Sequence, residues 1–405
     1  MRRLLKFICF SILLIFTSTT FLGCNEHEKE VDENTLKIWG NLLDNEVDEF
    51  QKIADKWTEK SGIEVKIYAT TATATNYIES KDSARPDIFL GASSEETGMY
   101  KKANIVEVVP EDFNTKDDVV SEDILKATMI DEIQYGVPLT QETVVLYYNK
   151  DLVDKVPETM EELIEIAREK GIAFEANNYY FSYGFISAFG GYIYKENENG
   201  FDYTDIGTDT SESINGLQYL QDLFTKDNLF LAGTTDIMAS GNFEAGKVAF
   251  YIGEAGRVRS FNNAEVNFGV SKIPSVNGNE VKPYKYVKMA VLDSNITKKE
   301  QAWDLLKEFI DKSDEVFMKT GPYAPTYKKS LESDTFKNDE YVKALYEQCN
   351  SSVLLPNIIE NQAINYVVNG CLDKLVLGEI TPKECGESMK KELEQTIQDI
   401  LIYED

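Results

Sequence analysis

The sequence predicts an α/β fold with more than one domain. Residues 36–39 alternate apolar and polar side chains as a strand does, and residues 44–60 carry apolar residues at helical spacing. Residues 63–67 then alternate again. A strand, a helix and a strand within about 30 residues form a βαβ unit, which implies a parallel sheet and a right-handed crossover. A chain of 405 residues has room for two or three domains.

The following segments continue the α/β pattern. Residues 86–90 are typical of a buried strand, and residues 91–94 are expected to open a helix. The apolar run 144–148 predicts another strand. Thr159 and Glu162 have the spacing of a capping box, so a helix is expected to begin there.

Three segments complete the expected elements. Residues 246–253 are typical of a strand that begins at a glycine and a lysine, and residues 301–310 have the apolar spacing of a helix. Thr381 before Pro382 predicts the start of a final helix that continues through Ile400. The chain shows no internal repeat and no low-complexity block.

The N-terminus has the features of an export signal. Three basic residues precede the apolar run 7–16, and a short polar stretch follows. This pattern predicts a signal peptide over residues 1–23. Cys24 directly after Gly23 resembles a bacterial lipobox, although Phe21 stands where leucine is usual. We expect lipid on Cys24, an acidic tether over 24–34 and a protein held at the outer face of the cell membrane. The alternative is an ordinary cleaved signal followed by an incidental cysteine.

The charge and the scarcity of histidine exclude several functions. The chain has 41 Lys and Arg against 70 Asp and Glu, a net charge of −29, so a phosphate backbone would be repelled and no nucleic-acid partner is expected. Its single histidine, His27, lies in the tether, which removes histidine-based zinc sites and Ser-His-Asp triads. Cys349, Cys371 and Cys385 lack metal-ligand spacing, and their redox state stays open. We therefore expect no metal, no cofactor and a protein that binds rather than catalyses.

Four stretches, in order, resemble the extracellular solute-binding proteins of ABC importers, specifically the maltose-binding-like sugar family. The stretch 136–152 is the most specific of them, and together they span essentially the whole mature chain. The four stretches are residues 36–65, 136–152, 243–250 and 378–382. The resemblance implies a two-lobed periplasmic-binding-protein-like fold, whose lobes are discontinuous in sequence and joined by a hinge.

The resemblance also implies where the lobes divide. The first α/β lobe would comprise residues 35–140 and 287–335, and the second residues 141–286 and 336–405. The chain would cross between them near 140–144, 286–290 and 331–341. A sugar or oligosaccharide bound between the lobes would favour the closed state, which the permease subunits of the importer would recognise. We expect a monomer that performs no covalent chemistry.

Candidate ligand-binding side chains follow from the same resemblance. Sugars are held by aromatic faces and by carboxylates or amides that bind hydroxyls. Glu142 stands where the family often has a ligand-facing acid, and Tyr180 matches an aromatic of the second lobe. The alternatives are a surface carboxylate for Glu142 and core packing for Tyr180. The remaining candidates are Asn41, Ser94, Asn178 and Tyr366.

The chain departs from maltodextrin-binding members at their stacking tryptophans. Gly91, Ala255 and Asn365 stand at the three positions. The tryptophans of this chain are instead expected in the core: Trp39, Trp57 and Trp303. The ligand is therefore expected to be a sugar other than maltodextrin.

Arginine is scarce in the mature chain, and two of its four arginines, Arg257 and Arg259, begin the predicted helix after residues 246–253. A guanidinium at a helix start suits a carboxylate, so Arg257 could contact an acidic sugar. The alternative is an ion pair with a nearby glutamate. Ligand identity, length and linkage stay open, as does the permease. A competing function is a secreted carbohydrate-active enzyme that uses paired carboxylates.

Overall fold

The computed structural model describes residues 34–113, 117–198, 200–227 and 229–402. The signal peptide, Cys24, His27 and most of the tether lie outside these residues. The chain divides into two units, Met1–Thr35 and Leu36–Asp405, and the description below concerns the second. Within the described ranges, no helix combines the length and the apolar character that a membrane crossing requires.

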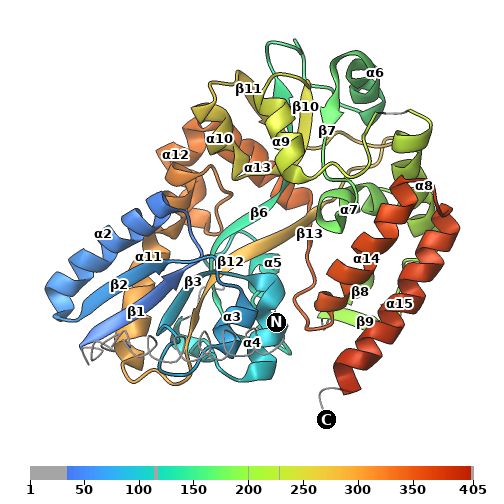
Figure 1. Ribbon diagram of the computed structural model, residues 1–405. Coiled ribbons are helices and arrows are strands. Elements are labelled where there is room, and N and C mark those ends of the chain that lie inside the picture. Colours follow the sequence, from blue (N-terminus) through green and yellow to red (C-terminus); the bar gives the residue numbers. More distant parts are fainter. Residues whose placement is uncertain (1–33, 114–116, 199, 228, 403–405) are drawn as a thin grey trace, which may run out of the picture. The chain divides into compact units, whose positions relative to one another are not determined.

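The core of the second unit is a nine-stranded sheet, counted over the described residues (Figure 1). Its order is β2-β1-β3-β12-β6-β10-β7, with β11 beside β6 and β13 beside β12. Its strands are β1 (Thr35–Gly40), β2 (Glu64–Ala69), β3 (Ile88–Ser93), β6 (Val137–Asn149), β7 (Ile172–Ala173), β10 (Phe250–Glu254), β11 (Phe268–Ser271), β12 (Tyr284–Leu292) and β13 (Val353–Leu354). Two small hairpins stand apart, β4 (Met129–Ile130) with β5 (Ile133–Gln134) and β8 (Tyr194–Asn197) with β9 (Gly200–Ile206).

Helices pack around this sheet, with α2 against β2 and α11, and with α14 against α15 (Figure 1). The longer helices are α2 (Asp44–Ser61), α6 (Met160–Lys170), α7 (Tyr179–Ser187), α8 (Ser211–Thr225), α9 (Asp236–Glu244), α11 (Lys299–Thr320), α13 (Glu340–Ser351), α14 (Asn361–Val376) and α15 (Pro382–Ile402). The shorter ones are α3 (Ala74–Glu79), α4 (Thr97–Ala103), α5 (Glu122–Lys126), α10 (Arg257–Asn263) and α12 (Asp334–Asn338), with 3₁₀ turns η1 (Ser94–Glu96), η2 (Glu111–Phe113) and η3 (Lys328–Glu332).

Local sequence signals located several elements correctly. The predicted α/β fold is confirmed, and β1, α2 and β2 follow one another as expected. Thr159 caps α6 by accepting from the backbone N–H of Glu162 at 3.2 Å. Thr381 accepts from the N–H of Glu384 at 3.2 Å at the start of α15.

Three boundaries differ from expectation. β3 continues through Ser93, so the helix expected at 91–94 begins only at Thr97, after η1. β10 begins at Phe250 rather than 246, because the backbone of Gly246 and Lys247 bonds back to the end of α9. α11 extends to Thr320, well beyond the predicted 301–310, because buried apolar residues recur along its whole length.

The long strand β6 changes partners along its length. Its first part pairs with β12, up to Thr143 opposite Lys285. From Val144 onward it pairs with β10, and from Leu146 also with β11. The change falls within residues 140–144, where the first crossing between lobes is predicted. The lobe boundaries themselves stay a prediction.

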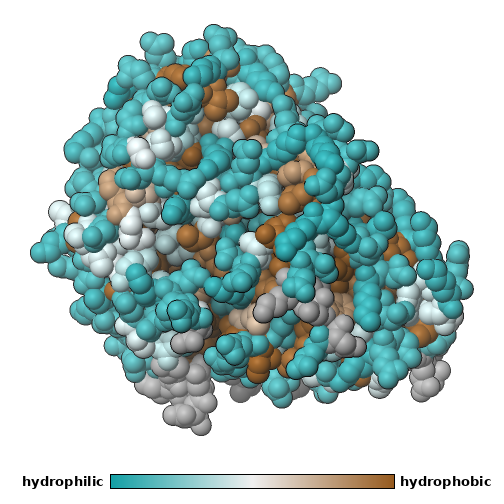
Figure 2. All heavy atoms as spheres, turned by 180° about the vertical axis from the view of Figure 1, so that it is seen from behind, coloured by the Kyte–Doolittle hydropathy of each residue, from teal (hydrophilic) through white to brown (hydrophobic). Residues whose placement is uncertain are grey.

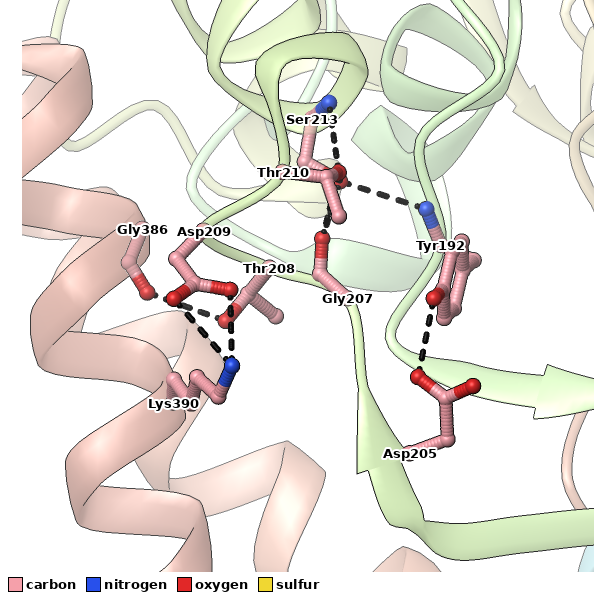
Figure 3. A network of polar contacts seen from close by, with 9 residues as sticks. All are labelled: Tyr192, Asp205, Gly207, Thr208, Asp209, Thr210, Ser213, Gly386 and Lys390. Atoms are coloured by element: carbon pink, nitrogen blue, oxygen red, sulfur yellow. Dashed lines mark hydrogen bonds and ion pairs between the residues drawn. The ribbon is translucent and has the colours of Figure 1, made fainter.

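A polar network ties α15 to the loop before α8 (Figure 3). The Thr208 hydroxyl donates to the Gly386 carbonyl at 2.9 Å, and the Lys390 ammonium lies 3.0 and 3.2 Å from the two carboxylate oxygens of Asp209. A Cβ at Gly386 would lie 2.4 Å from the Thr208 carbonyl oxygen, so only glycine allows this approach. The contacts fix the last helix against the rest of the chain.

Much of the surface is hydrophilic on the face that Figure 2 shows, whereas the tryptophans and cysteines described next are mostly interior. Trp57 and Trp303 are buried, as predicted, while Trp39 is half-buried and packs edge-on against Tyr77 and Phe89. The three described cysteines are buried and free: Cys349, Cys371 and Cys385.

Candidate ligand-binding site

Strand register gathers polar side chains on one face of the sheet. Glu142 on β6 lies opposite Tyr286 on β12, and Glu254 on β10 lies opposite Val144. Paired residues and residues two apart share a face of a sheet. Glu142, Glu254, Tyr286 and Lys288 therefore project from the same face, where β6 exchanges one partner for another.

Lys288 is the cation at the centre of this face. Its ammonium lies 2.8 Å from Oε1 of Glu142, and the two side chains are 16% and 5% exposed. The same ammonium lies 4.9 Å from the ring centroid of Tyr323, which is a cation–π distance. Burial opposes the charge on Lys288, but Glu142, Tyr323 and Glu46 more than offset burial, so its pKa is raised. Lys288 therefore stays protonated.

Glu46 brings a second acid to Lys288. It lies in the first turn of α2, is fully buried, and accepts from the backbone N–H of Leu43 at 2.9 Å. Burial raises the pKa of Glu46, and the positive charge of Lys288 only partly opposes this. One lysine thus faces two buried carboxylates.

Glu254 is a further acid of this face, near both Arg257 and Lys288. Its side chain is half-buried and makes no hydrogen bond or ion pair with a described residue. Burial, then Glu142 and Asp236, raise its pKa to about 7, against the smaller effects of Arg257 and Lys288. The strand end that carries it is fixed by Tyr147, whose hydroxyl donates to the Glu254 carbonyl at 2.7 Å.

Arg257 is paired with an acid of the same chain. Its guanidinium forms an ion pair with Asp236, the first residue of α9, and the Tyr251 hydroxyl donates to the other carboxylate oxygen. Arg257 therefore makes an ion pair within the chain, which was the alternative to ligand binding, and its partner is Asp236 rather than the expected glutamate. Arg259 points elsewhere and donates to the Asn45 side chain at 2.7 Å.

Tyr180 on α7 adds an unsatisfied hydroxyl. The residue is 9% exposed, its ring centroid lies 6.0 Å from that of Tyr286, and its hydroxyl has no hydrogen-bond partner among the described residues. Burial, followed by Glu254 and Glu142, raises the pKa of Tyr180, so the phenol stays neutral. A buried phenol without a partner can bind a ligand group.

These side chains form one group, which we call the central cluster. Its members are Glu46, Glu142, Asp236, Glu254, Arg257 and Lys288, with Tyr180, Tyr286 and Tyr323. The cluster includes three of the predicted site residues, Glu142, Tyr180 and Arg257. It can accept hydrogen bonds from several hydroxyl or amine groups and offer aromatic faces, which is the chemistry that a polar solute requires.

The other four candidates lie outside the cluster. The Ser94 hydroxyl accepts from the backbone N–H of Val287 at 3.0 Å, and the Asn178 amide oxygen caps α7 by accepting from the Tyr180 N–H at 3.0 Å. Asn41 is exposed after β1, and Tyr366 on α14 is 83% exposed. Their ligand-binding roles stay predictions.

Six members of the cluster were not predicted as site residues from the sequence. They are Glu46, Asp236, Glu254, Tyr286, Lys288 and Tyr323. One signal was present, because Glu254 directly follows the predicted strand 246–253 and stands just before Arg257. The ends of strands often carry ligand-binding residues. Tyr286 and Lys288 alternate within a predicted crossing, but only the pairing of β12 with β6 brings them to Glu142.

A separate hollow of about 500 Å³ lies beside β11. Its lining includes the ion pair of Lys272 and Glu280, together with Ile273 and Glu347. It contains none of the predicted site residues, and it is not part of the central cluster.

A mixed α/β fold with buried carboxylates and tyrosines on one sheet face defines a protein that can hold a polar solute. The chain belongs to the bacterial extracellular solute-binding protein family, whose family model matches residues 44–314.

Two relatives cover much of the chain. A maltooligosaccharide ABC transporter solute-binding lipoprotein of Streptococcus pneumoniae is 25% identical over 378 residues, covering 86% of this chain and 86% of the relative. A galactooligosaccharide-binding protein of Bacillus subtilis is 27% identical over 299 residues, covering 69% and 70%.

Solved structures show the same two-lobed periplasmic-binding-protein-like fold. A maltose-maltodextrin binding protein of Alicyclobacillus acidocaldarius has a TM-score of 0.84 at 22% identity, covering 89% of this chain and 100% of that one. A cyclo/maltodextrin-binding protein complexed with maltotetraose has a TM-score of 0.82 at 24% identity, covering 92% and 99%. The predicted fold class is confirmed.

Glu254 should make the stability of the protein depend on pH. The pKa of Glu254 is about 7 in the folded protein, against an ordinary value of 4.5. Protonated Glu254 therefore favours the folded state, and this contribution to the free energy of unfolding is complete below pH 4.5 and is lost as the pH rises through 7. Glu254→Gln removes this loss. We expect the variant to gain about 1–2 kcal/mol relative to wild type between pH 5 and pH 8, measured by urea unfolding.

Glu165→Gln is the matched control, because Glu165 is exposed on α6. It should show the wild-type pH dependence. Equal pH dependence of Glu254→Gln and wild type would contradict the assignment of a raised pKa to Glu254.

Proposed function

We propose that this protein binds a sugar or oligosaccharide outside the cell and delivers it to an ABC importer by hinge closure. The observation that carries the proposal is the central cluster, in which carboxylates and tyrosines share one sheet face. Carboxylates accept from sugar hydroxyls, and tyrosine rings pack on the C–H faces of the sugar ring. The oligosaccharide-binding relatives in the same family support this ligand class.

Within the site, we assign the ligand contacts first to Glu142 and Tyr180. Arg257 is a third contact, provided that the ligand competes with Asp236 for its guanidinium. Asn41, Ser94, Asn178 and Tyr366 are further candidates that closure of the lobes could bring to the ligand. A ligand that contacts both lobes stabilises the closed state by its higher affinity for that state.

The location follows from the N-terminus. A lipid on Cys24 would hold the protein at the outer face of the membrane, and the acidic tether 24–34 would separate it from the lipid surface. A lipoprotein among the relatives supports this anchoring. The protein would act as a monomer, present its closed form to the permease subunits and catalyse no reaction.

A thermal-shift screen of the purified mature protein tests the proposal. The panel contains neutral, acidic and aminated mono- and oligosaccharides, including maltotriose and a galactose trisaccharide. We expect at least one sugar to raise the unfolding midpoint with increasing concentration and to be recovered intact. Maltotriose should not be the best ligand, because Gly91, Ala255 and Asn365 replace the stacking tryptophans.

Two results would count against the proposal. Hydrolysis of the sugar would favour the alternative, a carbohydrate-active enzyme that uses paired carboxylates. No midpoint shift with any sugar of the panel would contradict a sugar-binding role altogether. Small-angle scattering with and without the bound sugar then tests closure, which should reduce the radius of gyration.

A further inference from the structure

The central cluster has more negative than positive groups. Within the described part of the chain, the cluster sets two cations, Lys288 and Arg257, against the four acids Glu46, Glu142, Asp236 and Glu254. Glu95 on η1 adds a further acid, since its carboxylate and that of Glu254 repel each other. Buried negative charge without a counter-charge is unfavourable, and burial accordingly raises the pKa values of Glu46, Glu95 and Glu254. A bound cation would relieve the same cost.

Both cations of the cluster are already occupied. Lys288 lies 2.8 Å from Glu142, and Arg257 forms its ion pair with Asp236. A carboxylate on the ligand would have to displace one of these acids and would meet the charges of the others. The arrangement therefore disfavours the acidic sugars that Arg257 suggested from the sequence.

Several polar groups of the central cluster have no hydrogen-bond partner in the described part of the chain, among them Oε1 of Glu46, Oε1 of Glu142 and the Tyr180 hydroxyl. The Glu254 carboxylate makes no hydrogen bond or ion pair, and the buried Tyr180 hydroxyl has no hydrogen-bond partner. Glu254 pairs in register with Val144 on β6, two residues from Glu142, and the strand partner of Glu142 is Tyr286. The ring centroid of Tyr286 lies 6.0 Å from that of Tyr180. A carboxylate together with a phenol oxygen can accept two hydrogen bonds from one ammonium group.

We propose that the sugar recognised by the central cluster carries a protonated amine, which binds Glu254 and the Tyr180 hydroxyl. This inference rests on the proposed function and names the ligand class of the same site. A charge-assisted hydrogen bond is roughly twice as strong as a neutral one, so the amine gives Glu254 a better partner than a hydroxyl does. It also supplies the missing positive charge.

Isothermal titration of the mature protein at pH 7 tests the amine. The probes are trisaccharides of glucosamine and of galactosamine, their N-acetylated counterparts, and the unsubstituted glucose and galactose trisaccharides. We expect at least one aminated sugar to bind ten times more tightly or better than its N-acetylated and unsubstituted counterparts. Glu254→Gln should reduce this ratio to about threefold or less, because the amide cannot pair with the ammonium.

The control is Glu165→Gln, which should keep the full ratio because Glu165 is exposed on α6 and remote in sequence from the cluster. Tighter or equal binding of a neutral sugar overturns the amine assignment and leaves the proposed function standing. The assignment is also overturned if Glu254→Gln keeps the full ratio. Binding of none of the probes overturns the amine assignment, and the broader thermal-shift panel then decides the proposed function separately.

Discussion

Replacing Asp293 by alanine should lower the free energy of unfolding by about 3–5 kcal/mol, as expected when one partner of a buried ion pair is removed. Asp293 Oδ2 lies 2.7 Å from Nε of Arg85, and the two side chains are 7% and 5% exposed. The same oxygen accepts from the Tyr77 hydroxyl at 2.9 Å, and Oδ1 accepts from the backbone N–H of Asn295 at 2.8 Å. Alanine leaves all three donors without this acceptor.

Two further variants separate the causes of this loss. Asp293→Asn keeps an acceptor and removes the charge, so it should cost less than alanine. Asp311→Ala is the surface control, because Asp311 is 60% exposed and pairs with Lys329 at 2.6 Å. That variant should change the unfolding free energy by about 1 kcal/mol or less. Equal losses for Asp293→Ala and Asp311→Ala in urea unfolding would contradict a special role for the buried network.

The sequence was informative where the signal is local. The cap of α6 at Thr159 and the start of α15 at Pro382 depend on residues within one helical turn, so their types and spacing suffice. The βαβ order also follows from periodicity alone. The start of β10 was missed because backbone hydrogen bonds of Gly246 and Lys247 close α9, and no side-chain pattern signals those bonds.

The site was predicted only in part because its contacts are distant in sequence. Lys288 pairs with Glu142 through the register of β12 with β6, and no local pattern specifies that register. The family resemblance suggested Glu142 and Tyr180, but it gave no sign that Asp236 pairs with Arg257. Ser94 follows a predicted strand, as a ligand-binding residue could, yet its hydroxyl accepts from the N–H of Val287. Only the folded chain shows which polar groups are already paired.

Lys288→Met should be the most damaging change within the central cluster. The variant keeps most of the side-chain volume but leaves Glu142 and Glu46 buried without their cation. The loss expected when a buried pair is broken in this way is about 3–5 kcal/mol at pH 7. Urea unfolding measures it directly. Lys390→Met is the matched control, because Lys390 and Asp209 are 37% and 33% exposed, and it should cost about 1 kcal/mol or less.

A second substitution tests whether charge is the cause. If uncompensated carboxylates destabilise Lys288→Met, the double variant that also carries Glu142→Gln should be more stable than Lys288→Met alone. In the wild-type background, Glu142→Gln should instead lower stability, because it removes the partner of Lys288. Lowering the pH from 7 to 5 should also reduce the difference in unfolding free energy between Lys288→Met and wild type. The reason is that buried carboxyls without a cation take up protons more readily. Suppose that neither Glu142→Gln nor lower pH reduces the loss of unfolding free energy in Lys288→Met. The role of Lys288 would then be the packing of its side chain against Tyr323.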